Sequence, residues 1–242
     1  MENNLSAVLN RQKFEREYIF DGIALLNASF ESYVVDVPER KEAEERINAR
    51  ISGQLAQYMK NNAYNLFPEA VRVYKESIAN NYPVRPFEAV MKYSAPFNTC
   101  GLLSLYYDRY EFTGGAHGNT VRKSDTYNLN NGRVLPLAAF FPRGFDYREY
   151  FIGQILTEAK KIMEVNPVFF ENYEELIVKN FNPDNYYLTP NGYAIYYQQY
   201  EIAPFSTGIV VFEIPYDAVN QILNPFICPQ NEGNNRAARG AN

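Results

Sequence analysis

Apolar residues recur every four positions in the first third of the chain, inside a segment otherwise rich in Glu, Lys and Arg. They are Ala43, Ile47, Ile51, Leu55 and Met59. This spacing places the side chains on one face of an α-helix, so it predicts a long amphipathic helix. Pro68 is expected to end that helix, with a second helix over residues 69–79. The apolar face of such a helix must be covered by another layer of the fold.

The covering layer is predicted to be a β-sheet, because the chain has 21 Tyr and 17 Phe, residue types that favour strands. Asp21–Gly22 predicts the turn of a hairpin, or the bend of one long strand, after polar residues 1–12 that we expect to be frayed. Later strands are expected over residues 87–97, 102–112 and 121–129, joined as a meander.

The second half of the chain combines helices and strands again. Apolar residues between Tyr150 and Ile162 predict a second long helix, and "YYLTPNGYAIYYQQYEI" predicts a hairpin, followed by a buried strand and a final helix over residues 215–223. We therefore expect an α+β fold, with largely antiparallel sheets and two long amphipathic helices packed on one face. It divides into two subdomains, residues 13–130 and 131–224, with a disordered tail over residues 225–242.

The formal net charge of the chain is −5. Sequence-independent nucleic-acid binding needs clustered Lys and Arg, so this balance argues against it, whereas a cationic protein would be attracted. One His and two cysteines, Cys100 and Cys228, are too few for an ordinary zinc site, and we expect neither a metal nor a cofactor. Whether the cysteines pair is left open. The sequence contains no run of about 20 apolar residues, the length that a membrane-spanning helix requires.

The single histidine lies in the glycine-rich stretch "YEFTGGAHGNT", residues 110–120. Gly114 and Gly115 allow a shaped loop between two strands, with Tyr110 and Asn119 near its ends. Such a loop can bind a partner, or it can be a plain hairpin loop with a surface imidazole at His117. Catalysis is a weaker alternative, because a general base needs a nucleophile and an orienting acid, and the sequence has no nucleophile elbow such as GxSxG.

A second loop-forming stretch, "YEIAPFSTG", covers residues 200–208. Tyr200 and Phe205 are aromatic, and Pro204 constrains the backbone before Phe205. Glu201 lies among aromatic residues, where burial would raise its pKa unless the carboxyl gains a hydrogen-bond partner. Tyrosine is favoured at protein interfaces, so the tyrosines near both loops are candidate binding residues. Wide strands packed in the core are the simpler explanation of the tyrosine runs.

Four stretches together resemble the RsiV-like domains of bacteria over residues 15–223. They are "YEFTGGAHGNT", "YNLNNGRVLPLAAFF", "YYLTPNGYAIYYQQYEIAPFSTG" and "FEIPYDAV", in that order. The resemblance implies paired domains of unknown function, found in lysozyme-sensing anti-sigma factors of the sigma-V type and ahead of the catalytic domain in some peptidoglycan deacetylases. It implies an extracytoplasmic module of the cell envelope that binds without catalysing, with lysozyme or a cell-wall glycan as its partner.

The site expected from this reasoning combines both loops. Its residues are Tyr110, Gly114, Gly115, His117, Asn119, Tyr200, Glu201, Pro204 and Phe205. No catalytic or metal-binding residue is predicted, and contact with a membrane would require a segment outside this sequence. Two alternatives remain: a cell-wall hydrolase or deacetylase-associated enzyme that uses His117 as its base, and a structural spacer domain.

Overall fold

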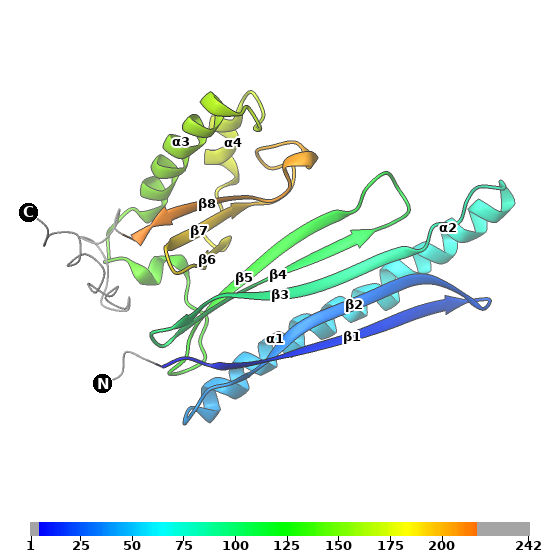
Figure 1. The fold of residues 1–242 in the computed structure, drawn as a ribbon, viewed down its shortest axis with the longest axis horizontal. Helices are drawn as coiled ribbons and strands as arrows, with labels where there is room; N and C mark the ends of the chain where they lie inside the picture. The colour runs from blue at the N-terminus through cyan, green and yellow to red at the C-terminus, as the bar shows by residue number, and fades with distance from the viewer. Residues whose placement is uncertain (1–4, 217–242) are drawn as a thin grey trace, which may run out of the picture.

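The computed structural model describes residues 5–216 and has the predicted α+β architecture, with largely antiparallel sheets (Figure 1). Five strands form one sheet in the order β1-β2-β3-β4-β5, and three strands form a second sheet in the order β6-β7-β8. The strands are β1 (Val8–Phe20), β2 (Ile23–Asp36), β3 (Phe87–Thr99), β4 (Leu102–Phe112), β5 (Asn119–Asn128), β6 (Tyr186–Leu188), β7 (Gly192–Tyr197) and β8 (Val210–Pro215).

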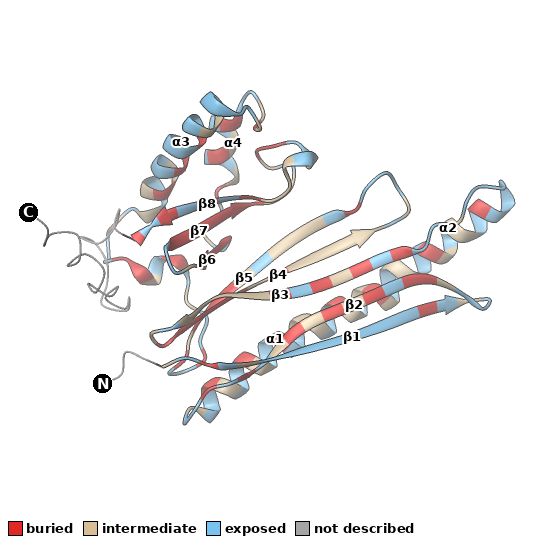
Figure 2. Cartoon of the chain, viewed as in Figure 1, coloured by how far each residue is buried: buried red, intermediate tan, exposed pale blue. Residues whose placement is uncertain are grey.

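The β1–β2 hairpin turns at Asp21–Gly22, where both residues have positive φ, as the Asp-Gly signal indicates. The expectation of a frayed start is wrong from Val8 onward, because β1 pairs with β2 along its whole length. The polar residues of β1 suit an edge strand, since charged side chains on an edge oppose pairing with other chains. Figure 2 shows β1 exposed over most of its length.

One helical segment of 39 residues joins β2 to β3, which pair in parallel. It consists of α1 (Lys41–Asn61), a π-helical turn (Asn62–Leu66) and α2 (Phe67–Ala79). Pro68 therefore does not end the helix. In the π turn, the N–H of Phe67 bonds the carbonyl of Asn62, five residues earlier, and this wider turn accommodates a proline that has no N–H to donate.

Two large hydrophobic cores follow from this arrangement. In the first, Ile47 and Ile51 of α1 pack on buried residues of β2 and β3, such as Phe30 and Met91. In the second, the sheet of β6–β8 packs against α3 (Tyr147–Val165) and α4 (Tyr173–Asn180). Figure 2 shows β7 buried along its length. None of the helices described within residues 5–216 has the length and hydropathy of a membrane-spanning segment.

The C-terminal predictions fall mostly beyond the part that the structure describes. Pro215 is the last residue of β8 and does not begin a helix. The remainder of the predicted final helix, the tail over residues 225–242 and Cys228 lie outside the described residues. Cys100 lies in the turn between β3 and β4, where it has positive φ.

Candidate binding site at the meeting of two loops

The two glycine- and proline-containing loops meet in the structure. The first joins β4 to β5, and the second leads from β7 to a short 3₁₀ helix (Phe205–Thr207). The imidazole of His117 stacks on the ring of Phe205, with 3.7 Å between the centroids, and the ring of Tyr200 lies 5.9 Å from that of Phe205. We call His117, Tyr200 and Phe205 the aromatic patch. His117 and Tyr200 are exposed, so the patch is available to a partner.

The other predicted residues have different positions around the patch. Tyr110 lies beneath the first loop, with its ring against Gly118. Gly114 has a φ of +83° and Gly115 is exposed, so both shape the loop without adding a side chain to the patch. Asn119 is exposed at the start of β5, and Pro204 is exposed next to Phe205.

Gly118 is required by the close approach of Tyr110. A Cβ atom at residue 118 would lie 2.3 Å from the Tyr110 ring, whereas a Cβ at Gly115 would meet no atom within 4 Å. We expect Gly118→Ala to lower the free energy of unfolding by about 1–2 kcal/mol through overpacking, and to weaken partner binding by moving the loop. Gly115→Ala is the matched control and should change neither quantity. Equal effects of the two substitutions in urea unfolding would contradict this role of Gly118.

Tyr200 has a strained backbone. Its φ is +66°, in the left-handed region that a residue with a bulky side chain rarely adopts. Tyr200 is 53% exposed. The turn is maintained by Glu201, whose Oε2 accepts a hydrogen bond of 2.7 Å from the N–H of Gln198. Strain at an exposed aromatic residue is typical of functional positions. Glu201 itself is turned toward this backbone, and burial raises its pKa while the hydrogen bond from Gln198 lowers it.

Because the backbone of Tyr200 is strained, replacing this residue with glycine should have opposite effects on stability and on partner binding. Tyr200→Gly should raise the free energy of unfolding by about 0.5 kcal/mol, because glycine adopts positive φ without the steric cost. The same substitution should weaken partner binding, because the exposed ring is lost. Thermal unfolding and calorimetry measure the two effects; a loss of stability without loss of affinity would show that Tyr200 serves the fold.

The second loop is anchored to the first sheet by two glutamines. The side chain of Gln198 accepts a hydrogen bond from the N–H of Arg122 (2.9 Å) and donates one to its carbonyl (2.8 Å). Gln199 accepts a hydrogen bond of 2.6 Å from the N–H of Thr120. These amides act as a substitute strand along the edge of β5, so the position of the aromatic patch is fixed by both sheets.

A partly buried cation, Arg122, supports the same junction. Arg122 forms two hydrogen bonds to Asp108, of 2.8 and 2.7 Å, and its guanidinium lies 4.0 Å from the centroid of the Tyr106 ring. The rings of Tyr187 and Tyr196 lie on the same guanidinium at 5.9 Å. Many tyrosines of the sequence runs are therefore structural, and they join the two sheets instead of contacting a partner.

The surroundings of His117 do not favour catalysis. Its Nδ1 contacts the carbonyl oxygen of Gly118 at 3.1 Å, and no hydroxyl or carboxylate of residues 5–216 is hydrogen-bonded to the ring. A general base needs both a nucleophile and an orienting acid within reach. Within the described chain, no group of three or more His, Cys, Asp or Glu residues could hold a metal ion. The geometry suits recognition by stacking and surface contact.

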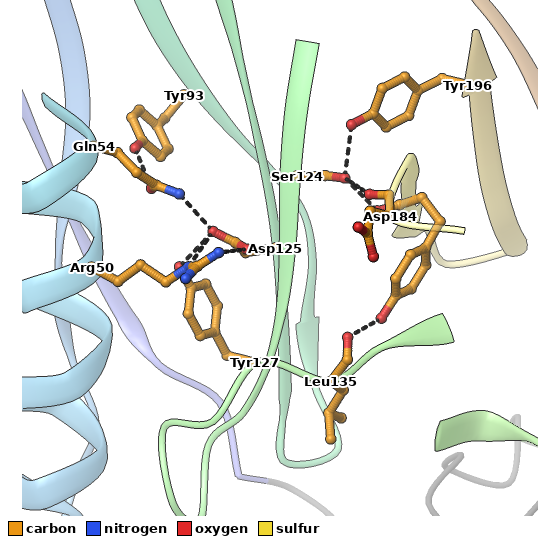
Figure 3. Close-up of polar contacts among 10 residues, drawn as sticks. Arg50, Gln54, Tyr93, Ser124, Asp125, Tyr127, Leu135, Asp184 and Tyr196 are labelled. Atoms are coloured by element: carbon orange, nitrogen blue, oxygen red, sulfur yellow. Dashed lines mark hydrogen bonds and ion pairs between the residues drawn. The ribbon is translucent and has the colours of Figure 1, made fainter. Parts of the chain in front are cut away.

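A second polar cluster lies between α1 and β5 (Figure 3). Asp125 is only 8% exposed and accepts hydrogen bonds from Arg50 Nε (2.8 Å) and Nη2 (2.7 Å), from Gln54 (2.8 Å) and from the hydroxyl of Tyr127 (3.2 Å). Tyr93 in turn donates a hydrogen bond of 2.8 Å to Gln54. This network connects the long helix to the edge strand and was not predicted, because its members are 71 and 75 positions apart in the sequence.

Two family models match different parts of the chain. Residues 30–120 match the family model described as Deacetylase PdaC, and residues 138–217 match DUF3298, a protein family of unknown function. These matches confirm the paired-domain resemblance inferred from the sequence motifs. No curated protein sequence matches the chain significantly.

Solved structures of the second family share the fold of this chain. A DUF3298 family member from Bacteroides fragilis is 19% identical, with a TM-score of 0.64 over 91% of this chain and 95% of that one. A DUF3298 family protein from Pseudomonas aeruginosa is 17% identical, with a TM-score of 0.60 over 94% and 98% of the two chains. The shared fold therefore extends over both sheets.

Proposed function

We propose that this chain, a PdaC-type domain followed by a DUF3298 domain, is an extracytoplasmic binding module of the bacterial cell envelope that docks a protein through the aromatic patch. The observation that carries the proposal is the contact of His117 with Phe205, because it unites two loops from different sheets into one exposed surface. Aromatic side chains that are exposed and rigidly held are enriched in the energetic centres of protein interfaces.

The backbone around the patch supports a preformed docking surface. Gln198 fixes the second loop to the edge of β5, and the strained Tyr200 is maintained in one conformation by the carboxylate of Glu201. A surface that is already ordered loses little conformational entropy on binding, which strengthens association. Catalysis is not favoured, since the His117 ring has no adjacent acid or nucleophile hydrogen-bonded to it between residues 5 and 216.

Lysozyme is the partner that the resemblance to RsiV-like domains implies, and its cationic surface is complementary to a chain of net charge −5. The direct test is isothermal calorimetry of the purified chain against lysozyme, with muropeptides in a parallel titration. Saturable 1:1 binding of lysozyme that weakens with rising salt supports the proposal. Binding of muropeptides alone would make the module a glycan receptor, and the absence of both would reject the proposed function.

A further inference from the structure

A pocket of about 390 Å³ lies beside the outer edge of β5. It is bounded by Arg50 and Gln54 of α1, by residues 123–126 of β5, and by two segments of the C-terminal half, residues 134–136 and residues 182 and 184–186. Its volume is at the lower end of the range for small-molecule sites, and such sites are frequent where two domains meet. The pocket is separate from the aromatic patch, and none of the three patch residues lines it.

The backbone of β5 leaves a gap in its outward hydrogen bonding at Ser124, which lines this pocket. In an antiparallel ladder, the N–H and C=O groups of every second residue point to the same edge. The outward groups of Arg122 are bonded by the Gln198 side chain, and the outward carbonyl of Thr126 accepts a hydrogen bond of 2.7 Å from the N–H of Leu135. Ser124 lies between these two positions. Within residues 5–216, no group of the C-terminal half is hydrogen-bonded to the outward N–H and C=O of Ser124 or to the outward N–H of Thr126.

Gln198 shows which chemistry fits an outward position of this edge. Its primary carboxamide presents an oxygen and an N–H side by side, so it pairs with both groups of Arg122 at once. A single trans secondary amide directs its N–H and C=O to opposite sides and cannot do this alone, so a peptide backbone would need the two amides on either side of one Cα. Addition of a whole β-strand is excluded, because Gln198 and Leu135 already occupy the edge on either side of Ser124.

The pocket beside Ser124 is lined by equal numbers of positively and negatively charged side chains. Arg50 donates hydrogen bonds to the Asp125 carboxylate from Nε and Nη2, and its Nη1 takes no part in this ion pair. The side chains of Lys123 and Asp184 also line the pocket, and neither makes a hydrogen bond within the described chain. Two cations and two carboxylates therefore surround the space, which suits a ligand that carries one charge of each sign.

We propose that this pocket binds an amino acid with a primary carboxamide, glutamine or asparagine, either free or at the end of a short peptide. The carboxamide would close the gap at Ser124 as Gln198 does at Arg122. The α-carboxylate is complementary to Lys123 and Arg50 Nη1, and the α-ammonium is complementary to Asp184. Leu135 and Pro136 provide apolar contact for the methylene groups.

The test uses glutamine, asparagine and, as the matched control, glutamate, in which a carboxylate replaces the carboxamide. We expect saturable binding of at least one carboxamide in calorimetry, a shift of the Ser124 amide signal in NMR spectra, and at least tenfold weaker binding of glutamate. Binding of glutamate equal to that of glutamine, or no binding of either carboxamide at millimolar concentration, would overturn the proposal.

Side-chain variants separate this site from the patch. Lys123→Ala and Asp184→Ala should each weaken carboxamide binding at least fivefold, whereas Lys160→Ala, on the exposed face of α3, should leave it unchanged. Unchanged binding in both pocket variants would contradict the assignment. Substitutions in the aromatic patch should not affect carboxamide binding, so failure of one proposal is distinguishable from failure of the other.

Discussion

Replacing His117, Tyr200 and Phe205 together with alanine is expected to weaken binding of the protein partner by about 100-fold. Each ring is part of one exposed contact surface, and removal of central aromatic residues from an interface commonly costs about 2 kcal/mol or more per residue. The effects of neighbouring residues are not additive, so the estimate for the triple variant stays below the sum. Calorimetry against lysozyme measures the change in Kd.

The control for this variant replaces two exposed tyrosines that lie elsewhere. Tyr64 is 72% exposed in the π-helical turn and Tyr82 is 66% exposed after α2. Their joint replacement with alanine removes aromatic surface of similar chemistry and should leave affinity unchanged. Equal loss of binding in the control, or wild-type binding in the triple variant, would move the docking surface away from the patch. Near-ultraviolet circular dichroism of each variant verifies that the fold is retained.

Asp125→Ala is expected to lower the free energy of unfolding by about 2–3 kcal/mol. The substitution removes the shared acceptor of Arg50, Gln54 and Tyr127, and buried polar groups that lose their partner are destabilising. Arg50 has a side chain that is half exposed, so water compensates part of the lost ion pair and the effect remains below that of a fully buried pair.

Urea unfolding of Asp125→Ala, compared with Asp184→Ala, tests that estimate. Asp184 is exposed and its carboxylate forms no hydrogen bond in the described structure, so its removal should change stability by less than about 0.5 kcal/mol. Similar midpoints for the two variants would show that the network around Asp125 is not a principal link between α1 and β5.

Local signals in the sequence predicted those parts of the fold that depend on local chemistry. Asp21–Gly22 specifies the hairpin turn because both residues tolerate positive φ, and the four-residue repeat from Ala43 specifies the buried face of α1. The course of β1 was missed because its strand state depends on pairing with β2 and not on its own polar composition. The continuity of the helix through Pro68 was missed because a π turn has no reliable sequence signal.

The candidate site was predictable only in part. Glycine and proline spacing indicated two shaped loops, but their meeting depends on the long-range pairing of Gln198 with β5, which no local pattern contains. The same holds for Ser124, whose unpaired backbone groups become evident only once β5 is known to be an edge strand. An informative sign in the sequence was Gln198–Gln199 directly after a strand, since paired amides can close an exposed sheet edge.

The aromatic patch is proposed as the docking surface for a protein. NMR cross-saturation of the isotope-labelled chain in complex with lysozyme locates that surface, because saturation reaches only those amides that lie at the interface. We expect the affected signals to fall within residues 113–120 and 198–207. A complex whose affected signals lie on β1 or α2, with the two loops unaffected, would place the docking surface elsewhere.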